Sequence, residues 1–195
     1  MDASIKPDLF DTYMLSSLLK ETGGRGNGYV NDPADHGGET VWGITVARAR
    51  AAGYTGAMCD MTKLEALAIY RLYYYRQPGF DLIAPISAKL AGVLLDFGIN
   101  FDPHIPSMFL QRGLNVLNQG GADYADITMD GSAGAGTRYA LNAYLAKRGA
   151  EGERVLLALI AAFAAVRYVE IAEHTGTQER FEFGWLSNRA FPKSA

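Results

Sequence analysis

A glycine-rich stretch near the start of the chain contains two carboxylates and a threonine. It runs over residues 21–45, with the sequence ETGGRGNGYVNDPADHGGETVWGIT. Glu21 precedes the glycines, Asp35 lies inside the stretch, and Thr40 follows five residues later. Glycoside hydrolysis needs such a carboxyl pair, because one acid protonates the leaving oxygen while the other stabilises a cation or activates water. The alternative is an ordinary loop, since Gly, Asn, Asp and Pro are common turn residues.

A helix is expected directly before Glu21. Residues 10–20 place apolar side chains at helical spacing, so Glu21 is expected at the C-terminal end of this helix, facing the loop. The negative end of the helix dipole, together with partial burial, favours a raised pKa at Glu21, which a general acid requires. The alternative is a solvated glutamate at a helix end.

Helical patterns continue through the rest of the chain. A capping box at Thr62–Glu65 predicts a helix that continues through Leu64, Leu67, Tyr70 and Tyr74. Further helices are expected over residues 86–97, closed by Gly98, over residues 109–117, and around Leu141 and Tyr144. The apolar run at residues 155–166 is too short to span a bilayer and predicts a buried core helix.

These patterns predict an all-α, mainly helical fold, with a minor β-hairpin formed by residues 29–45. The Asn-Gln-Gly-Gly segment at residues 118–121 is the best internal boundary. We therefore expect a catalytic region at residues 1–120 and a helical region at residues 121–195, packed together as one compact unit.

Composition excludes several classes of protein. The chain has 195 residues, 49% of them hydrophobic and 20% charged, as in a globular protein. Its net charge of −3 gives no basic field for nucleic acid, and Cys59 is the single cysteine, so no internal disulfide forms. The start shows no apolar signal-peptide core, so synthesis in the cytoplasm without a signal peptide is expected.

No metal or cofactor is expected. The three histidines have no partner at metal-ligand spacing, and no closing glutamate follows Asp123, Asp126 and Asp130 at the spacing of an EF-hand.

The segment from Tyr29 to Thr45 resembles the N-terminal signature of glycoside hydrolase family 108, the muramidases found among phage endolysins. The family form is Glu-Gly-Gly, then Tyr-Val-Asn-Asp-Pro-x-Asp-x-Gly-Gly-x-Thr-x-x-Gly-Ile-Thr. In this chain extra residues stand between Glu21 and Tyr29, which is a departure from the family pattern. Residues 130–137 and the ending Phe-Gly-Trp-Leu-Ser-Asn-Arg at 183–189 resemble the predicted peptidoglycan domain that follows the catalytic half in this family.

The resemblance implies a lysozyme-like fold and cleavage of the β-1,4 bond between N-acetylmuramic acid and N-acetylglucosamine. It assigns Glu21 as the general acid, Asp35 as the group that stabilises the cation-like transition state or activates water, and Thr40 as the residue that holds this water. Sugar contacts are expected at Tyr29, Trp42, Tyr74, Asn100 and Gln111, although the aromatics suit a core and the amides suit helix or turn caps.

Two other functions stay open, a lytic transglycosylase and a non-catalytic wall-binding or virion structural protein of the same fold. In each reading the partner is peptidoglycan, the protein is a monomer with no stable membrane insertion, and it reaches the wall after release or secretion.

Overall fold

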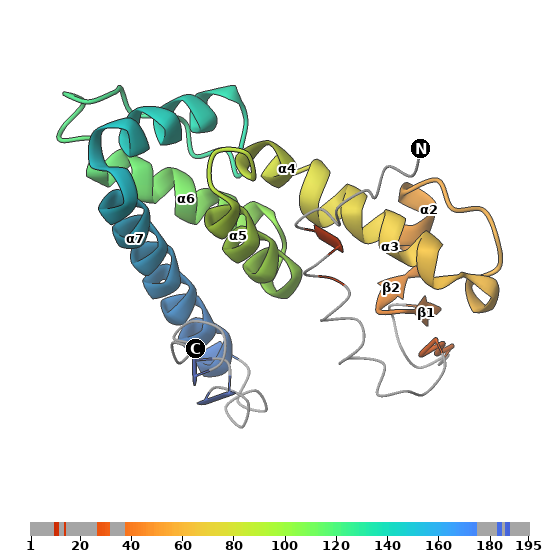
Figure 1. Ribbon diagram of the computed structural model, residues 1–195. Coiled ribbons are helices and arrows are strands. Elements are labelled where there is room, and N and C mark those ends of the chain that lie inside the picture. Colours follow the sequence, from red (N-terminus) through yellow and green to blue (C-terminus); the bar gives the residue numbers. More distant parts are fainter. Residues whose placement is uncertain are drawn as a thin grey trace, which may run out of the picture. The chain divides into compact units, whose positions relative to one another are not determined.

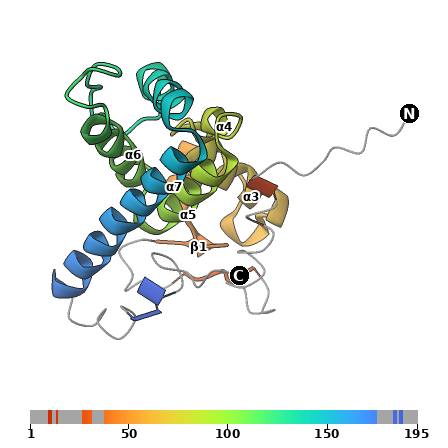
Figure 2. The ribbon, with the colours of Figure 1, turned by 60° about the vertical axis from the view of Figure 1, so that its left-hand side comes forward.

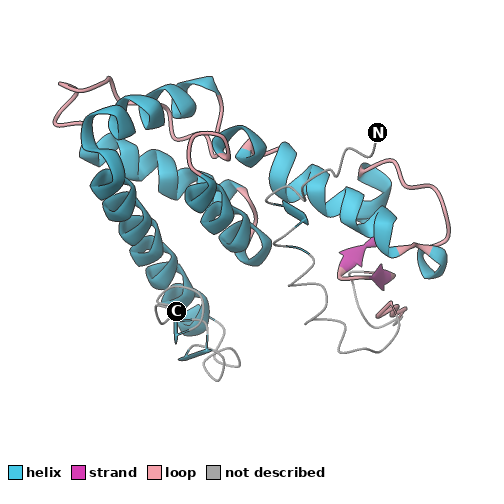
Figure 3. Cartoon of the chain, in the orientation of Figure 1, coloured by secondary structure: helices cyan, strands magenta, loops and turns pink. Residues whose placement is uncertain are grey.

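The computed structural model describes residues 10–11, 14, 27–31, 38–174, 183–184 and 186–187. By its internal contacts the chain divides into two compact units, residues 1–77 and residues 78–195. The first unit holds the small sheet and several short helices, and the second is helical (Figure 3). The prediction of a mainly α fold with a minor hairpin is confirmed.

In the first unit a hairpin of two strands, β1 (Thr40–Val41) and β2 (Ile44–Thr45), leads directly into α2 (Val46–Ala51). Thr45 ends the hairpin and also caps the helix, because its hydroxyl accepts a hydrogen bond from the Arg48 amide at 3.3 Å. The 3₁₀-helix η1 (Met58–Asp60) follows.

The predicted capping box starts α3 (Lys63–Arg71) and is confirmed in both directions. The Glu65 amide donates to the Thr62 hydroxyl, and the Thr62 amide donates to the Glu65 carboxylate. The helix buries Ala66, Ile69 and Tyr70, whereas Leu64 is 79% exposed, so the buried face differs from the one that the sequence suggested.

At its C-terminal end α3 continues into a π-helix, η2 (Leu72–Arg76). The wider turn buries Tyr75 and leaves Tyr73 and Tyr74 half-exposed. The buried apolar residues of this unit gather under the hairpin and α3: Phe10, Met14, Val41, Ile44, Ala49, Met58, Met61, Ala66, Ile69, Tyr70 and Tyr75. Phe10, Asp11 and Met14 are helical, as predicted, and the remainder of that expected helix lies outside the described residues.

The second unit contains α4 (Phe80–Ile83), α5 (Ala88–Phe101), α6 (His104–Leu117) and α7 (Ala135–His174). Figures 1 and 2 show α5, α6 and the second half of α7 as neighbouring helices, and α6 packs on both α5 and α7. The prediction that Gly98 closes its helix is wrong. The helix runs on to Phe101, and an added Cβ at Gly98 would lie 3.3 Å from the Pro103 Cα, so this glycine permits close packing instead.

Helix α7 is two helices joined at a kink, which Figure 1 shows as a clear change of direction. Gly149 lies at the kink with φ 58° and ψ −146°, a conformation open to glycine alone. Beyond it, one residue in four is buried along a stripe of Gly152, Leu156, Ile160, Ala164, Tyr168 and Ala172.

The predicted apolar run at residues 155–166 therefore packs through one face of α7. By length and composition this helix is apolar enough to cross a membrane, and 28% of its most apolar window is buried inside the structure. A core helix of a soluble protein passes the same test, so this property alone is weak evidence for a membrane span.

The units do not coincide with the expected division at residues 120 and 121. The contacts place α4, α5 and α6 with α7, because α5 and α6 pack on each other and on α7. The packing of the two predicted regions into one unit stays a prediction.

Candidate active site

Thr40 occupies the middle of a small antiparallel arrangement. It pairs with Thr45 across the hairpin, and on its other side it exchanges two main-chain hydrogen bonds with Val30, at 2.8 and 2.9 Å. The backbone of Thr40 is thus held on both edges, and the residue itself is half-buried. A threonine fixed in this way presents its hydroxyl from a rigid support, which a residue that holds a water molecule requires.

The hairpin turns at Trp42 and Gly43, whose φ angles are 53° and 72°. Two positive φ angles define a type I′ turn, which suits a two-residue hairpin loop. Positive φ is natural for glycine but strained for tryptophan, so the surroundings must hold Trp42 in place.

Three hydrogen bonds hold Trp42. Its indole Nε1 donates to the Met61 carbonyl at 3.0 Å, its amide donates to the Asn27 carbonyl at 2.9 Å, and its own carbonyl accepts from the Tyr70 hydroxyl at 2.9 Å. Trp42 is half-buried. Its side chain therefore anchors the hairpin to the segment after η1. Its role as a sugar contact stays a prediction.

Asn27 fixes the segment that leads to Tyr29. Its side-chain Nδ2 donates to the Cys59 carbonyl at 3.0 Å, and its Oδ1 accepts from the Tyr29 amide at 3.2 Å. Tyr29 is 37% exposed, so its ring is accessible for the sugar contact that the sequence predicts. No sequence pattern indicated a role for Asn27, because an asparagine inside a glycine-rich segment is typical of a turn.

Tyr74 belongs to an aromatic cluster around Arg48. The guanidinium carbon of Arg48 lies 5.1 Å from the centre of the Tyr74 ring and 5.4 Å from that of Tyr73, and Arg48 donates to the Tyr74 hydroxyl. The Tyr74 ring stacks on Tyr70 at 5.3 Å, and Tyr70 in turn bonds to Trp42. Arg48 is a second residue that sequence reasoning missed, because only the fold brings α2 beside η2.

The two residues with the central predicted roles, Glu21 and Asp35, lie outside the described residues. Among the other predicted site residues, hydrogen bonds connect Tyr29, Thr40 and Trp42 in the first unit. Tyr74 joins this network through the stacking of its ring on Tyr70. Asn100 and Gln111 belong to the second unit.

The structure contradicts Gln111 as a sugar contact. Its side chain is 1% exposed, and Nε2 donates to the Asp130 carboxylate, the Ser132 carbonyl and the Thr137 hydroxyl at 2.7 to 3.1 Å. Its Oε1 accepts from the Gly131 amide at 2.9 Å. No group of Gln111 is left for a ligand, so the alternative of a turn cap is the correct one.

Gln111 is the first of three amides that hold the loop at residues 118–134; Asn115 also lies on α6, and Asn118 is the C-terminal cap of that helix. Asn115 exchanges two hydrogen bonds with the main chain of Ile127, and Asn118 donates to the Asp126 carboxylate at 2.6 Å. The side chain of Gln111 also lowers the pKa of Asp130, since its hydrogen bond favours the charged carboxylate. These bonds hold a loop that has no regular structure of its own.

Asn100 is exposed in the last turn of α5, and its Nδ2 donates to the Asp96 carbonyl at 2.7 Å. Its role as a sugar contact stays a prediction. Within the described ranges no group of three His, Cys, Asp or Glu residues is placed to hold a metal ion.

Two models of known protein families match this chain. Residues 15–101 match the family model described as glycosyl hydrolase 108, and residues 105–190 match the one described as a predicted peptidoglycan domain. The chain carries a glycosyl hydrolase 108 domain. The peptidoglycan domain follows it in the order that the sequence predicts, so the resemblance is confirmed.

A solved structure, "Structure of Brucella abortus SagA", is similar to this chain. The two sequences are 24% identical, and the match covers 89% of this chain and 87% of the other chain. The TM-score of 0.57 shows a shared fold. No curated protein matches the chain in sequence. The two family matches make this a lysozyme-like glycoside hydrolase that acts on peptidoglycan.

Proposed function

We propose that this protein is an N-acetylmuramidase that hydrolyses the β-1,4 bond between N-acetylmuramic acid and N-acetylglucosamine. The observation that carries the proposal is the hairpin at residues 40–45, which places Thr40 of the family signature between Val30 and Thr45 on a backbone fixed at both edges. The strained turn at Trp42 adds support, since strain of this kind gathers at functional sites.

In this proposal Glu21 protonates the leaving glycosidic oxygen as the general acid. Asp35 stabilises the cation-like transition state or activates the attacking water, and the Thr40 hydroxyl holds that water. Tyr29, Trp42 and Tyr74 supply aromatic surface for sugar rings, and Asn100 a polar contact. No cofactor takes part in this scheme.

The products of digestion test the reaction. Mass spectrometry of purified peptidoglycan treated with the protein is expected to show new reducing muramic acid ends. Anhydro-muramic ends would mark a lytic transglycosylase, and no new ends would mark a non-catalytic wall-binding or virion structural protein.

Three matched amide substitutions test the residues. Glu21→Gln keeps the size of the side chain but cannot deliver a proton, so activity is expected to fall by a factor on the order of 100 or more. Asp35→Asn is expected to reduce activity, and Glu39→Gln, in the same loop at a position that the family pattern leaves unspecified, to leave it nearly unchanged. Full activity of Glu21→Gln beside an inactive Glu39→Gln would show that the acid is misassigned.

The biological setting follows from the reaction. As an endolysin-like, bacteriolytic enzyme, of phage or bacterial origin, the protein acts as a monomer on wall peptidoglycan after release or secretion from the cytoplasm. Lysis of cells on which the purified protein acts from outside, compared with Glu21→Gln, tests this part of the proposal.

A further inference from the structure

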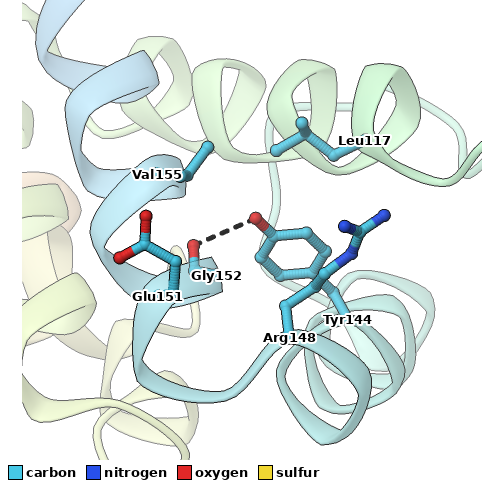
Figure 4. A pocket seen from close by; sticks show the side chains of 6 residues that line it. All are labelled: Leu117, Tyr144, Arg148, Glu151, Gly152 and Val155. Atoms are coloured by element: carbon cyan, nitrogen blue, oxygen red, sulfur yellow. Dashed lines mark hydrogen bonds between the residues drawn. The ribbon is translucent and has the colours of Figure 1, made fainter.

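A pocket of about 160 Å³ lies where the end of α6 meets the kink of α7 (Figure 4). The predicted peptidoglycan domain at residues 105–190 contains the whole pocket. Its lining combines apolar, aromatic and charged groups: Leu117, Tyr144, Arg148, Glu151, Gly152 and Val155.

Two glycines and a tyrosine fix the shape of this pocket. Gly149 makes the kink, and Gly152 lets the two halves of α7 approach, because a Cβ there would lie 2.3 Å from the Arg148 Cβ. The Tyr144 hydroxyl closes the bend by donating to the Gly152 carbonyl at 3.0 Å, and Tyr144 is 2% exposed. The ring that forms the pocket wall is therefore held in place before any ligand arrives.

Some of the charged side chains around the pocket have ion-pair partners, and one does not have such a partner among the described residues. Glu151 accepts two hydrogen bonds from Arg154, at 2.6 and 2.9 Å, and Lys147 forms an ion pair with Asp123. For Arg148, by contrast, the described part of the chain offers the guanidinium no hydrogen bond or ion pair. In Figure 4 this guanidinium and the Glu151 carboxylate lie on opposite sides of the Tyr144 ring. Among the described residues the pocket thus holds one cation without an ion-pair partner, which suits a carboxylate.

The size of the pocket limits the ligand. Sites for drug-sized ligands measure roughly 300–1,000 Å³, so this pocket suits one small residue rather than a disaccharide. Leu117 and Val155 offer an apolar wall for a methyl group beside the Arg148 cation. A small aliphatic side chain next to a free carboxylate is the chemistry of the alanine that ends a peptidoglycan stem peptide.

We propose that this pocket binds the C-terminal alanyl carboxylate of peptidoglycan stem peptides, with Arg148 as the carboxylate-binding residue. The inference rests on the proposed function only in that peptidoglycan is the substrate. It gives the second domain a defined task, which is to hold the peptide part of the polymer whose glycan part is cleaved.

The test is a titration of the full-length protein with N-acetyl-D-alanyl-D-alanine, followed by NMR or calorimetry. The free acid is expected to bind, and its C-terminal amide to bind roughly tenfold more weakly, since one charge-assisted contact is lost. Arg148→Gln is expected to weaken binding of the acid by a similar factor. Arg167→Gln makes the same charge change on an exposed part of α7 and is expected to bind like the parent protein.

Equal binding of acid and amide, equal binding by Arg148→Gln and Arg167→Gln, or no binding at roughly 10 mM probe would overturn the proposal. Cleavage of glycan strands stripped of their peptides separates this result from the proposed function. Stripped strands that are cut while the probe fails to bind refute the pocket alone. A bound probe with uncut strands refutes the muramidase and leaves the pocket standing.

Discussion

The hydroxyl of Tyr70 on α3 donates a hydrogen bond of 2.9 Å to the main-chain oxygen of Trp42 at the tip of the β1–β2 hairpin. Twenty-eight residues separate the two in sequence. Through this bond the helix supports a turn whose tryptophan has a strained positive φ angle. The hairpin that carries Thr40 is therefore held from α3 as well as by its own strand pairing.

Removal of the Tyr70 hydroxyl should destabilise the first unit. Tyr70→Phe leaves the Trp42 carbonyl without this donor, so a loss of about 1 kcal/mol is expected. Urea unfolding followed by Trp42 fluorescence, in a Trp185→Phe background, measures it. Tyr73→Phe, on a half-exposed ring of η2, is the matched control and should change stability little; equal losses in the two variants would argue against a supporting role for Tyr70.

Gly43→Ala should cost more than Gly53→Ala. Both glycines have positive φ, 72° and 86°, so each substitution carries a conformational cost of about 1 kcal/mol. Only at Gly43 does the new Cβ also meet an obstacle, the Tyr70 hydroxyl at 2.9 Å, while the space around Gly53 is open. Combining Gly43→Ala with Tyr70→Phe should remove part of the excess, and a strictly additive double variant would show that the hydroxyl is not the obstacle.

Gln111→Leu should reduce stability strongly and affect catalysis only through folding. The substitution leaves the Gly131 amide and the Asp130 carboxylate without their buried partner, which costs roughly 3 kcal/mol. Thermal unfolding of the variant measures the loss, and Asn142→Ala, on an exposed residue of α7, is the control. A stable Gln111→Leu protein with a raised KM for glycan would restore Gln111 as a sugar contact.

Glu153 should make stability depend on pH at acid values. The Ser87 hydroxyl, at 2.7 Å, and then Lys89 hold the pKa of Glu153 below its ordinary value of 4.5. The folded state thus favours the charged form, so the stabilisation is full above pH ~5 and is lost as the pH falls through the lowered pKa. The Tm of Glu153→Gln should lie below that of the parent at neutral pH, and the gap should close as the pH falls through that lowered pKa.

Glu173→Gln, an exposed change on the same helix, provides the reference for that experiment. A Tm gap that persists unchanged at acid pH would show that Glu153 contributes through packing rather than through its charge.

Much of the local structure can be predicted from the sequence, because it depends on interactions between residues that are close in the chain. The capping box needs only Thr62 and Glu65 three residues apart, and the hairpin needs a glycine after Trp42 and β-compatible neighbours. The spacing of apolar residues likewise predicts helices in the regions of α5, α6 and α7, because this spacing is also a local property of the chain. The family signature, which begins with the Glu matched to Glu21 and continues over residues 29–45, supplied the assignment of Glu21, Asp35 and Thr40. Of these three residues, the described structure includes Thr40 alone.

Tertiary contacts decided the rest, because an amide or an aromatic ring has the same sequence signal in a core and in a binding site. The sequence alone is compatible with Gln111 as a sugar contact. In the folded chain, residues of the loop at 118–134 and Thr137 bond to both polar atoms of the Gln111 side chain. Leu64 and Leu156 have similar spacing signals, yet one is 79% exposed and the other fully buried, since only packing selects the face. Arg148 comes to lie beside Tyr144 in the pocket through the kink at Gly149, which no local pattern specifies.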